Sequence, residues 1–273
     1  MLADALLLLA FTALLFIPLE VLVPMHRDKA LRRPGLATDL LHVLLSGFLI
    51  RAGFATSVAG IGMATAHLAP VAIGATIRSQ PDWLQFIELF VLSDLCFYVG
   101  HRLVHAVPWL WRFHAVHHSS EQLDWLASFR VHPVDQILNA SLIALPGIAL
   151  GFGGEPLLLY ALLYRWHSLL LHSNVRISLG PLDRLIATPH FHHWHHADQI
   201  EAHDRNFGGQ TLIWDRLFRT AYVPPNLPDR YGVSDPLPRD YVGQLLAPFT
   251  STASTKDQGR ETSTLAAATP ERC

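Results

Sequence analysis

Hydrophobic residues gather into long runs along much of the chain, and short polar stretches separate these runs. The first run covers residues 2–24, about the 20 mostly apolar residues that a helix needs to cross the hydrocarbon core of a bilayer. Four further runs cover residues 37–76, 83–100, 133–150 and 155–171. The pattern predicts a membrane protein whose helices cross the bilayer about four times.

A cleaved signal peptide is the alternative explanation for the first run. Such a peptide begins with positive charge and ends at a cleavage site of small residues. Neither feature is present here, and the positive residues follow the run instead, at Arg27, Lys29, Arg32 and Arg33. We therefore expect a membrane helix, and the positive-inside bias places this basic loop in the cytoplasm and the N-terminus outside.

The later runs set an expected topology. The second run is long enough for one span plus an apolar segment in the outer leaflet, and the pattern leaves the path of residues 51–80 open. The third run then returns the chain to the cytoplasmic side. The last two runs are separated by the turn-like sequence GFGGEP, which predicts a helical hairpin whose two ends face the cytoplasm.

The C-terminal part of the chain loses this pattern. After Trp214 the sequence is rich in proline and charge, which favours an irregular cytoplasmic segment. Ser, Thr and small residues dominate residues 250–273, which cannot bury enough apolar surface to become ordered. We expect a single membrane domain over residues 1–249, followed by this disordered tail.

Composition and charge agree with a membrane protein and exclude several functions. Of 273 residues, 51% are hydrophobic and 15% are charged, whereas a soluble domain carries about 25% charged residues. The formal net charge of -2 leaves no basic surface for a nucleic-acid backbone, so nucleic acid is excluded as a partner. Two cysteines, Cys96 and Cys273, are too few for a disulfide framework or a thiolate metal site.

Histidine is the unusual residue type. There are 17 histidines, and only His26, His42 and His67 lie outside the segment from residue 101 to residue 203. Three clusters have spacings that place imidazoles on one face of a helix, and each HxxHH motif is expected to point its three imidazoles in one direction. The clusters are His101 and His105, then His114, His117 and His118, and finally His192, His195 and His196.

Imidazole binds Zn, Cu, Fe or Ni, and eight such ligands exceed what one ion accepts. The clusters therefore predict a centre with two metal ions. A single histidine near a membrane surface is more often interfacial or hydrogen-bonded, but three matched clusters favour metal binding. His190 and His193 lie off the shared helix face and are weaker ligand candidates, and His167 is expected to pack on the lipid side or against neighbouring helices.

These motifs resemble the fatty acid hydroxylase superfamily, which includes sterol desaturases and hydroxylases of sphingolipids and fatty acids. The resemblance covers about residues 85–222, through DLCFYVGHRLVH, HAVHHSSEQLDWLASFRVHP, LLHSNVRISLGPLDRLIATPHFHHWHH and DRNFGGQTLIWDRLFRTAY, in matching order and spacing. It implies that the eight clustered histidines bind metal, with His172 as a ninth ligand and His132 as a tenth candidate. Arg219 stands where the family's closing element has glycine, and His190 is an extra histidine before the second HxxHH.

Acidic residues near the histidines are further candidates. Asp94 lies two helical turns before the first cluster and matches an acidic residue of the family. A carboxylate within the membrane is costly unless it is paired, so Asp94 is a catalytic candidate, with a structural hydrogen bond to another span as the alternative. Asp204, Asn206 and Asp215 are placed to orient ligating imidazoles, and an ion pair with Arg216 is the simpler alternative for Asp215.

We therefore expect an all-α fold, a polytopic membrane helix bundle of about four spans with a cytoplasmic, histidine-rich helical cap. The resemblance implies a membrane-bound non-haem di-iron oxygenase that hydroxylates or desaturates a lipid with O2. The sequence contains no flavin, haem or iron–sulfur motif, so electrons must come from a separate cytoplasmic donor, of ferredoxin or cytochrome type with its reductase. In a bacterial cell the protein would lie in the inner membrane.

Three other functions are compared with this expectation. A lipid or sterol desaturase of the same family would use the same residues. A zinc-dependent membrane hydrolase needs only three protein ligands and usually a glutamate base in an HExxH motif, which does not occur here. A haem-binding electron carrier would place paired histidines within facing spans, whereas these lie at the ends of spans. The sequence leaves open the lipid, the carbon attacked, the donor and the oligomeric state.

Overall fold

The fold is described from a computed structural model, which describes residues 2–29, 33–68, 71–235 and 237–250. Within these residues the regular structure is helical, and the only β-type contacts are isolated bridges. The fold is therefore all-α, as the sequence predicts. Residues 251–273, which make up nearly all of the predicted tail, lie outside the described residues.

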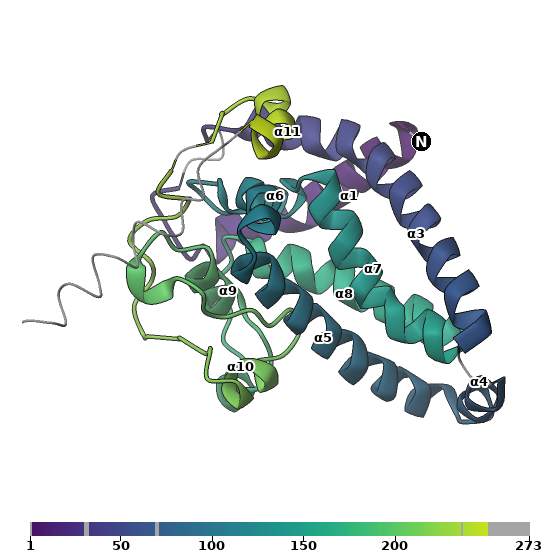
Figure 1. The fold of residues 1–273 in the computed structure, drawn as a ribbon. Helices are drawn as coiled ribbons and strands as arrows, with labels where there is room; N and C mark the ends of the chain where they lie inside the picture. Colours follow the sequence, from purple (N-terminus) through teal and green to yellow (C-terminus); the bar gives the residue numbers. More distant parts are fainter. Residues whose placement is uncertain (1, 30–32, 69–70, 236, 251–273) are drawn as a thin grey trace, which may run out of the picture.

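Long helices form the body of the molecule (Figure 1). They are α1 (Leu2–Leu22), α3 (Gly47–Leu68), α5 (Asp82–Ala106), α7 (Pro133–Leu150) and α8 (Gly154–His172). The short helix α2 (Leu36–Leu41) leads into α3 through the π-helical turn η1 (His42–Ser46), so that residues 36–68 form one continuous helical segment.

Four helices of the described residues are long and apolar enough to cross a membrane, which confirms the expected number of spans. They are Ala3–Leu22, Leu36–Ala66, Asp82–Ala106 and Pro133–Leu150. Helix α8, the second arm of the predicted hairpin, is not among them. Polar side chains such as Arg165 and His167 lower its hydropathy.

The segment whose path the sequence left open is helical. Helix α3 continues to Leu68, and the short helix α4 (Val71–Arg78) follows. The Arg78 side chain donates a hydrogen bond to the carbonyl oxygen of Gly151 (3.0 Å), which places the end of α4 beside the turn between α7 and α8. Gly151 ends α7 with a φ of 71°, a conformation that favours glycine.

The hairpin of α7 and α8 determines where the histidines meet. Helix α5 packs against both arms, and α3 packs against α7. Because the hairpin reverses the chain, the start of α7 and the end of α8 lie at the same end of the bundle as the end of α5 (Figure 1). His172 is thereby returned to the histidines that follow α5.

Short elements cover this end of the bundle and form a histidine-rich cap. They are α6 (Pro108–His118), η2 (Trp125–Phe129), η3 (Gly180–Arg184), α9 (Pro189–His195), η4 (Ile200–Ala202), α10 (Ile213–Leu217) and α11 (Tyr241–Thr250). The sequence predicted only irregular structure where α11 occurs. This helix is held by tertiary contacts, because Gln244 hydrogen-bonds His42 of η1 (2.9 Å).

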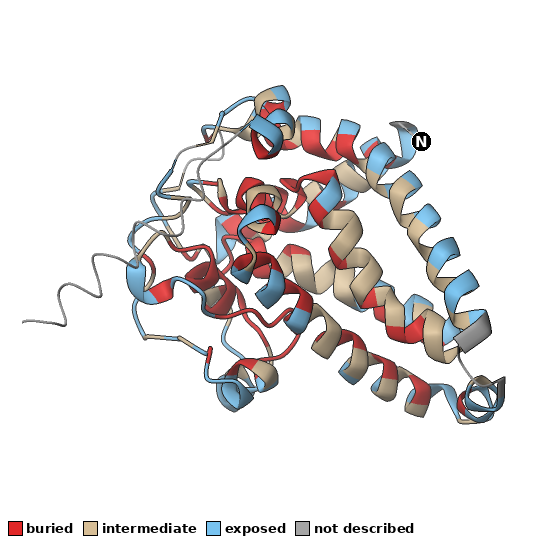
Figure 2. Ribbon diagram, in the orientation of Figure 1, coloured by how far each residue is buried: buried red, intermediate tan, exposed pale blue. Residues whose placement is uncertain are grey.

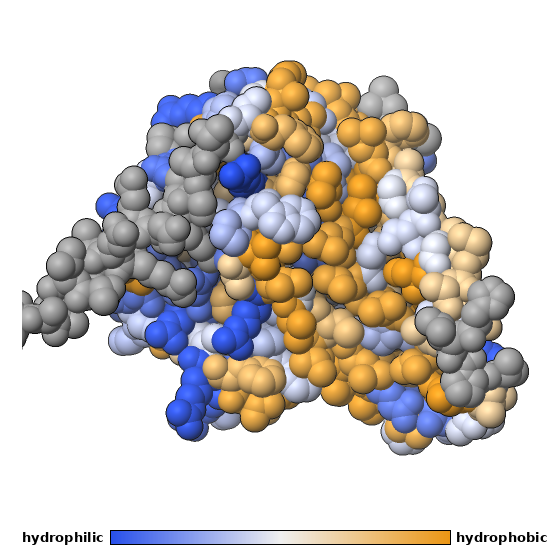
Figure 3. Space-filling view, in the orientation of Figure 1, coloured by the Kyte–Doolittle hydropathy of each residue, from blue (hydrophilic) through white to orange (hydrophobic). Residues whose placement is uncertain are grey.

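Burial and hydropathy divide the molecule in the same way. Buried residues concentrate in the cap and at the bundle end beneath it (Figure 2). The long helices instead expose large apolar side chains, including Leu14, Leu22 and Met63, and Figure 3 shows a broad hydrophobic surface over this part of the molecule. Exposed apolar area of this extent is stable in lipid rather than in water, as expected for a membrane protein.

A buried ion network ties the basic loop after α1 to the cap. The Arg33 guanidinium contacts the carboxylates of Asp39 (2.5 Å) and Asp124 (2.6 Å). Arg130 contacts the other oxygen of Asp39 (2.5 Å). The loop and the histidine-bearing cap therefore lie on one side of the helix bundle.

Candidate metal centre

Nine buried histidines form two groups where the bundle meets the cap. The first group is His101, His105, His114, His118 and His195. The second group is His117, His172, His192 and His196. Within each group, one ring nitrogen from every member lies within 4.8 Å of the others.

The two HxxHH motifs divide between these groups, which corrects the expectation that each points three imidazoles in one direction. In α6, His114 and His118 join the first group and His117 joins the second. In the segment that begins with α9, His192 and His196 join the second group and His195 joins the first. On a helix, residues i and i+4 are nearly aligned, whereas i+3 is about 100° away from i+4. Each motif therefore serves two neighbouring groups.

The local sequence explains why the short helices carry these residues. Pro108 and Pro189 occupy the first turns of α6 and α9, where the fixed φ of proline favours helix initiation. Thr188 caps α9 by accepting a hydrogen bond from the Phe191 amide (3.4 Å). His101 and His105 need no separate element, because they form the last turns of α5.

Outer hydrogen bonds fix the protonation of several rings. His101 Nδ1 lies 2.8 Å from the Phe207 carbonyl oxygen, and His114 Nδ1 lies 3.1 Å from the Asp135 carboxylate. Oxygens of these types only accept, so each Nδ1 must carry the proton. Each Nε2 is then an unprotonated nitrogen with a lone pair.

These two lone pairs face each other, since the Nε2 atoms of His101 and His114 are 3.1 Å apart. The second group repeats the arrangement. His117 Nδ1 donates to the Arg130 carbonyl (3.1 Å) and His172 Nδ1 to the Ser168 carbonyl (2.7 Å), and their Nε2 atoms lie 3.0 Å apart. Two facing lone pairs repel unless a cation lies between them. The residues present therefore fit a metal ion in each group.

A buried ring nitrogen without a partner and the lowered pKa of several histidines also indicate metal binding. His118 Nε2 is buried and makes no hydrogen bond with the described residues. Burial, followed by the neighbouring imidazoles, lowers the pKa of several cap histidines well below 6.5, namely that of His117, His118, His192 and His196. These rings are neutral at physiological pH, which is the form that binds metal.

Backbone carbonyls orient four of these rings, and sequence patterns could not reveal them. Arg205 and Phe207 supply two such carbonyls from one segment, to His195 (2.8 Å) and His101 (2.8 Å). The side chains of Asn206 and Asp215 do not contact the imidazoles and instead bond backbone groups around the segment that supplies these carbonyls. Asp215 accepts hydrogen bonds from the amides of Phe207 (2.8 Å) and Gly208 (2.7 Å), and so holds the segment rather than an imidazole. Its partners also include Thr220 (2.6 Å).

Asn206 and Asp204, the two other residues predicted to orient imidazoles, have different partners. Asn206 donates to the carbonyls of Phe191 (2.9 Å) and Tyr222 (2.7 Å), which links the same segment to α9. Asp204 is the one that lies near a ligand candidate, with its carboxylate 3.7 Å from His105 Nδ1. An acid that the sequence analysis did not select, Asp135 at the start of α7, contacts His114 directly. The signal for it was an acidic residue just after the RVHP sequence.

Asp94 is completely occupied by hydrogen bonds. Its carboxylate accepts from the Gln210 amide (2.9 Å), the Thr211 hydroxyl (2.6 Å) and the Trp214 indole (3.1 Å). These contacts join α5 to the segment that leads into α10, and Asp94 does not line the cavity beside the histidines. Its geometry is that of the structural alternative, although the bonds lead to the cap rather than to another span.

His132 lies apart from both groups. Its Nδ1 accepts a hydrogen bond from the Val134 amide (3.2 Å), so its Nε2 carries the proton and donates to the Leu245 carbonyl (3.2 Å). The ring thus caps α7 and holds α11. His167, His190 and His193 also lie outside the groups and hydrogen-bond backbone carbonyls.

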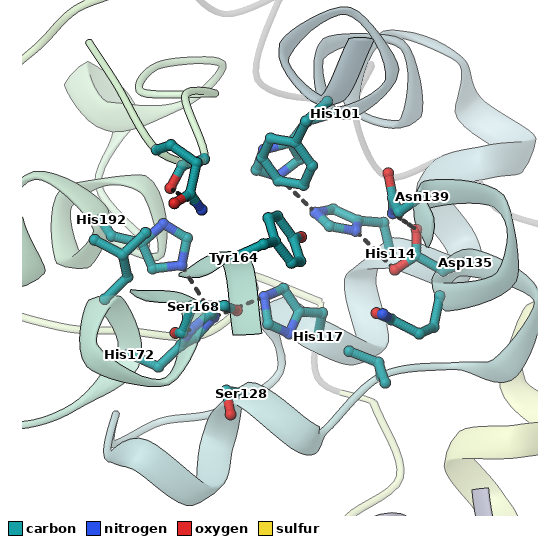
Figure 4. Close-up of a pocket in the computed structure, with 16 residues that line it drawn as sticks. His101, His114, His117, Ser128, Asp135, Asn139, Tyr164, Ser168, His172 and His192 are labelled. Atoms are coloured by element: carbon teal, nitrogen blue, oxygen red, sulfur yellow. Dashed lines mark hydrogen bonds and ion pairs between the residues drawn. The ribbon is translucent and has the colours of Figure 1, made fainter. Parts of the chain in front are cut away.

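A small cavity lies beside the histidines, between the helix bundle and the cap (Figure 4). Phe97, Leu171 and Val131 form apolar parts of its wall, and Asn139 and Tyr164 are among its polar parts. Its volume is about 60 Å³, enough for a short section of a lipid rather than a whole molecule.

Comparison with known proteins identifies the family. The family model described as fatty acid hydroxylase matches residues 86–220. The ornithine lipid hydroxylase OlsE of Rhizobium tropici is 32% identical over 237 residues, which is 84% of this chain and 71% of that protein. The chain belongs to the fatty acid hydroxylase family. All nine grouped histidines lie within the region matched by the family model.

Other relatives of this chain share a shorter region. The alkylglycerol monooxygenase of Homo sapiens is 32% identical over 151 residues, and that of Caenorhabditis elegans is 30% identical over 142 residues. These regions cover 54% and 50% of this chain, but 33% and 27% of the relatives. No solved structure matches the chain. Family and relatives identify the protein as an oxygenase-type oxidoreductase.

Proposed function

We propose that this protein is a non-haem di-iron enzyme that hydroxylates a membrane lipid. The observation that carries the proposal is the pair of facing imidazole lone pairs, one pair in each histidine group. Such an arrangement is stable only around cations, and two adjacent cations suit the activation of O2. The family, and relatives that are a lipid hydroxylase and an alkylglycerol monooxygenase, favour hydroxylation over desaturation.

The proposed ligands are the nine grouped histidines. When bound, iron would supply the oxidant that removes hydrogen from an unactivated C–H bond, which no side chain can do. The balanced reaction converts the lipid, O2, two electrons and two protons into the lipid alcohol and water. We leave His132 out of the ligand set because both of its nitrogens have other partners.

The protein's own residues hold and shield this site. Carbonyls of Phe207, Arg205, Arg130 and Ser168 fix the Nδ1 protons of their imidazoles, so that each Nε2 points inward. Asp135 has the same role for His114. Burial of all nine rings excludes bulk water from the site. We retain a direct catalytic role of Asp94 as a testable alternative to its role in holding the cap.

Zinc hydrolysis is the competing function from a different class. Catalytic zinc sites use three protein ligands and leave one position open for water. The two groups here hold five and four histidines, and this number favours redox-active iron.

We further propose that the centre faces the cytoplasm and receives electrons there. The positive-inside bias assigns the basic loop to the cytoplasm. Arg33 of that loop contacts Asp124 of the cap, so the cap would share its side. A ferredoxin or a cytochrome, with its reductase, is the proposed donor.

Oxygen labelling tests the proposed reaction. The purified protein is supplied with membrane lipid, reductant, donor and labelled O2, and the lipid products are analysed by mass spectrometry. A hydroxylase places one labelled oxygen atom in the product. An unlabelled alkene would support the desaturase alternative, and an oxygen atom derived from water would support hydrolysis.

A further inference from the structure

The cavity beside the histidines is lined by both apolar and polar side chains. Phe97 and Leu171 offer apolar contact, as expected for a site that accepts an alkyl chain. Polar side chains share the lining, among them Asn139 of α7 and Tyr164 of α8. A site that oxidised the middle of a hydrocarbon chain would have no use for polar groups at this depth, because an alkyl chain leaves them unsatisfied.

Asn139 is the clearest case. Its side chain is only 7% exposed, and its Nδ2 donates to Asp135 Oδ1 (2.9 Å). A carboxylate cannot donate, so the remaining amide atom must be the oxygen. This Oδ1 is buried and makes no hydrogen bond with any described residue. A buried acceptor without a partner is costly, and a ligand that carries a donor would satisfy it.

Asn139 is also held close to the histidines. Asp135 bridges the two, since one carboxylate oxygen contacts Asn139 and the other contacts His114 (3.1 Å). The Asn139 amide is therefore two hydrogen bonds away from a ligand candidate. A lipid group bound to it lies beside the reacting carbon, not at the far end of the molecule.

Tyr164 provides a second polar group in the same cavity. Its side chain lines the cavity together with those of His101, His114 and His117 (Figure 4). The ring is braced by Phe97, with ring centroids 5.8 Å apart. A phenol can donate or accept a hydrogen bond, so it can complement a group already bound by Asn139.

We infer that the substrate carries a hydroxyl or amide N–H group next to the carbon that is oxidised, and that Asn139 Oδ1 accepts a hydrogen bond from this group while Tyr164 lies on its other side. This inference rests on the proposed function and adds to it the class of lipid and the region attacked. The enzyme then acts near the polar head of its lipid rather than in the middle of an acyl chain.

Matched lipids test this inference without knowledge of the natural substrate. One pair is a hexadecyl glycerol ether and its di-O-methyl derivative, and a second pair is a fatty acyl amide with an N–H and its N-methyl derivative. Binding of each lipid to the full-length protein in detergent is measured directly. In at least one pair we expect the donor-bearing lipid to bind about tenfold more tightly, as for one buried hydrogen bond.

Substitutions assign the preference to its residue. Asn139→Leu should abolish the difference within the pair, while the methylated lipid binds as before. Ser141→Ala is the matched control, because Ser141 lies on the same helix but hydrogen-bonds Ser57 (2.7 Å) away from the cavity. Tyr164→Phe should weaken binding of the donor-bearing lipid to a smaller degree. If Asn139→Leu does not fold, the preference of the wild-type protein still decides the question.

Equal binding within both pairs by the wild-type protein would overturn the inference, as would a preference that survives Asn139→Leu. Oxidation of the same lipids is measured in parallel with labelled O2. Preferential binding without oxygen incorporation would leave this inference supported and count against the proposed function. If both members of a pair bind equally and both incorporate labelled oxygen, the proposed function is supported and this inference is overturned.

Discussion

Single histidines in this protein are distinguished by what their second ring nitrogen contacts. His117 and His172 commit Nδ1 to carbonyl oxygens and leave Nε2 facing another imidazole. His132 commits both nitrogens to backbone partners. The same residue type therefore serves as a ligand candidate in one place and as a helix cap in another.

Metal content of single variants tests this distinction. His118→Ala should lower the bound metal, because His118 Nε2 is buried with no partner among the described residues. His132→Ala should retain full metal and lose only stability, by about 1 kcal/mol for a lost cap. His203, which is exposed, supplies a neutral control. Equal metal loss in His118→Ala and His132→Ala would show that the hydrogen-bond pattern does not identify ligands.

Arg219 is notable for its backbone conformation. It stands where the family's closing element has glycine, and its φ is 60°, in the left-handed region that disfavours side chains. We expect Arg219→Gly to raise the free energy of unfolding by about 0.5–1 kcal/mol, after the extra chain entropy of glycine is allowed for. Thermal unfolding in detergent measures this change.

Asn206 is the control for Arg219, because its φ of 58° is similar but its side chain is bonded. Asn206→Gly should lower stability, since two carbonyls lose their donor. A fall in stability for Arg219→Gly as well would mean that its side chain has a role that these contacts do not account for.

At the scale of elements, the cap is attached to the bundle through a few buried acids. Asp94 joins α5 to the segment before α10 through three hydrogen bonds. Asp94→Ala leaves three donors without an acceptor. We expect it to lower the free energy of unfolding by about 3 kcal/mol and to cause partial loss of metal. Asp94→Asn should be milder. Unchanged stability and metal together with lost turnover would instead support a catalytic role.

The Arg33 network is the second attachment. Its guanidinium is buried between Asp39 and Asp124, and removal of one partner from a buried ion pair costs about 3–5 kcal/mol. We expect Arg33→Met to destabilise the protein by this amount and to free the loop from the cap, which limited proteolysis would detect. Lys29→Met should have a smaller effect, because its ammonium lies 3.7 Å from Asp124. Equal effects would contradict the assignment of Arg33 as the main link.

At the scale of the whole molecule, sequence periodicity and spacing predicted the helical fold, the four apolar helices and the α7–α8 hairpin. Spacing also selected eight of the nine histidines that the structure brings together, and the family resemblance added the ninth, His172. These features depend on local pattern, which a sequence carries directly.

The features that were not predicted depend on tertiary contacts. Each HxxHH motif contributes histidines to both groups, and this division depends on how α6 and α9 pack against the other helices. The carbonyls of Arg205 and Phe207 have no side-chain signature, and α11 is stabilised by contacts such as that of Gln244 with His42. The contacts of Asp94 with Thr211 and of His132 with Leu245 likewise join residues that are remote in sequence.

The central claim is a two-iron centre held by nine histidines, and metal analysis of the purified protein, combined with an optical spectrum, tests it most directly. We predict about two iron ions per chain without a haem band, in line with the two groups. We also predict that His118→Ala and His192→Ala, one from each group, each lower this value. Zinc in place of iron, a single ion per chain, or full iron content in both variants would contradict the account.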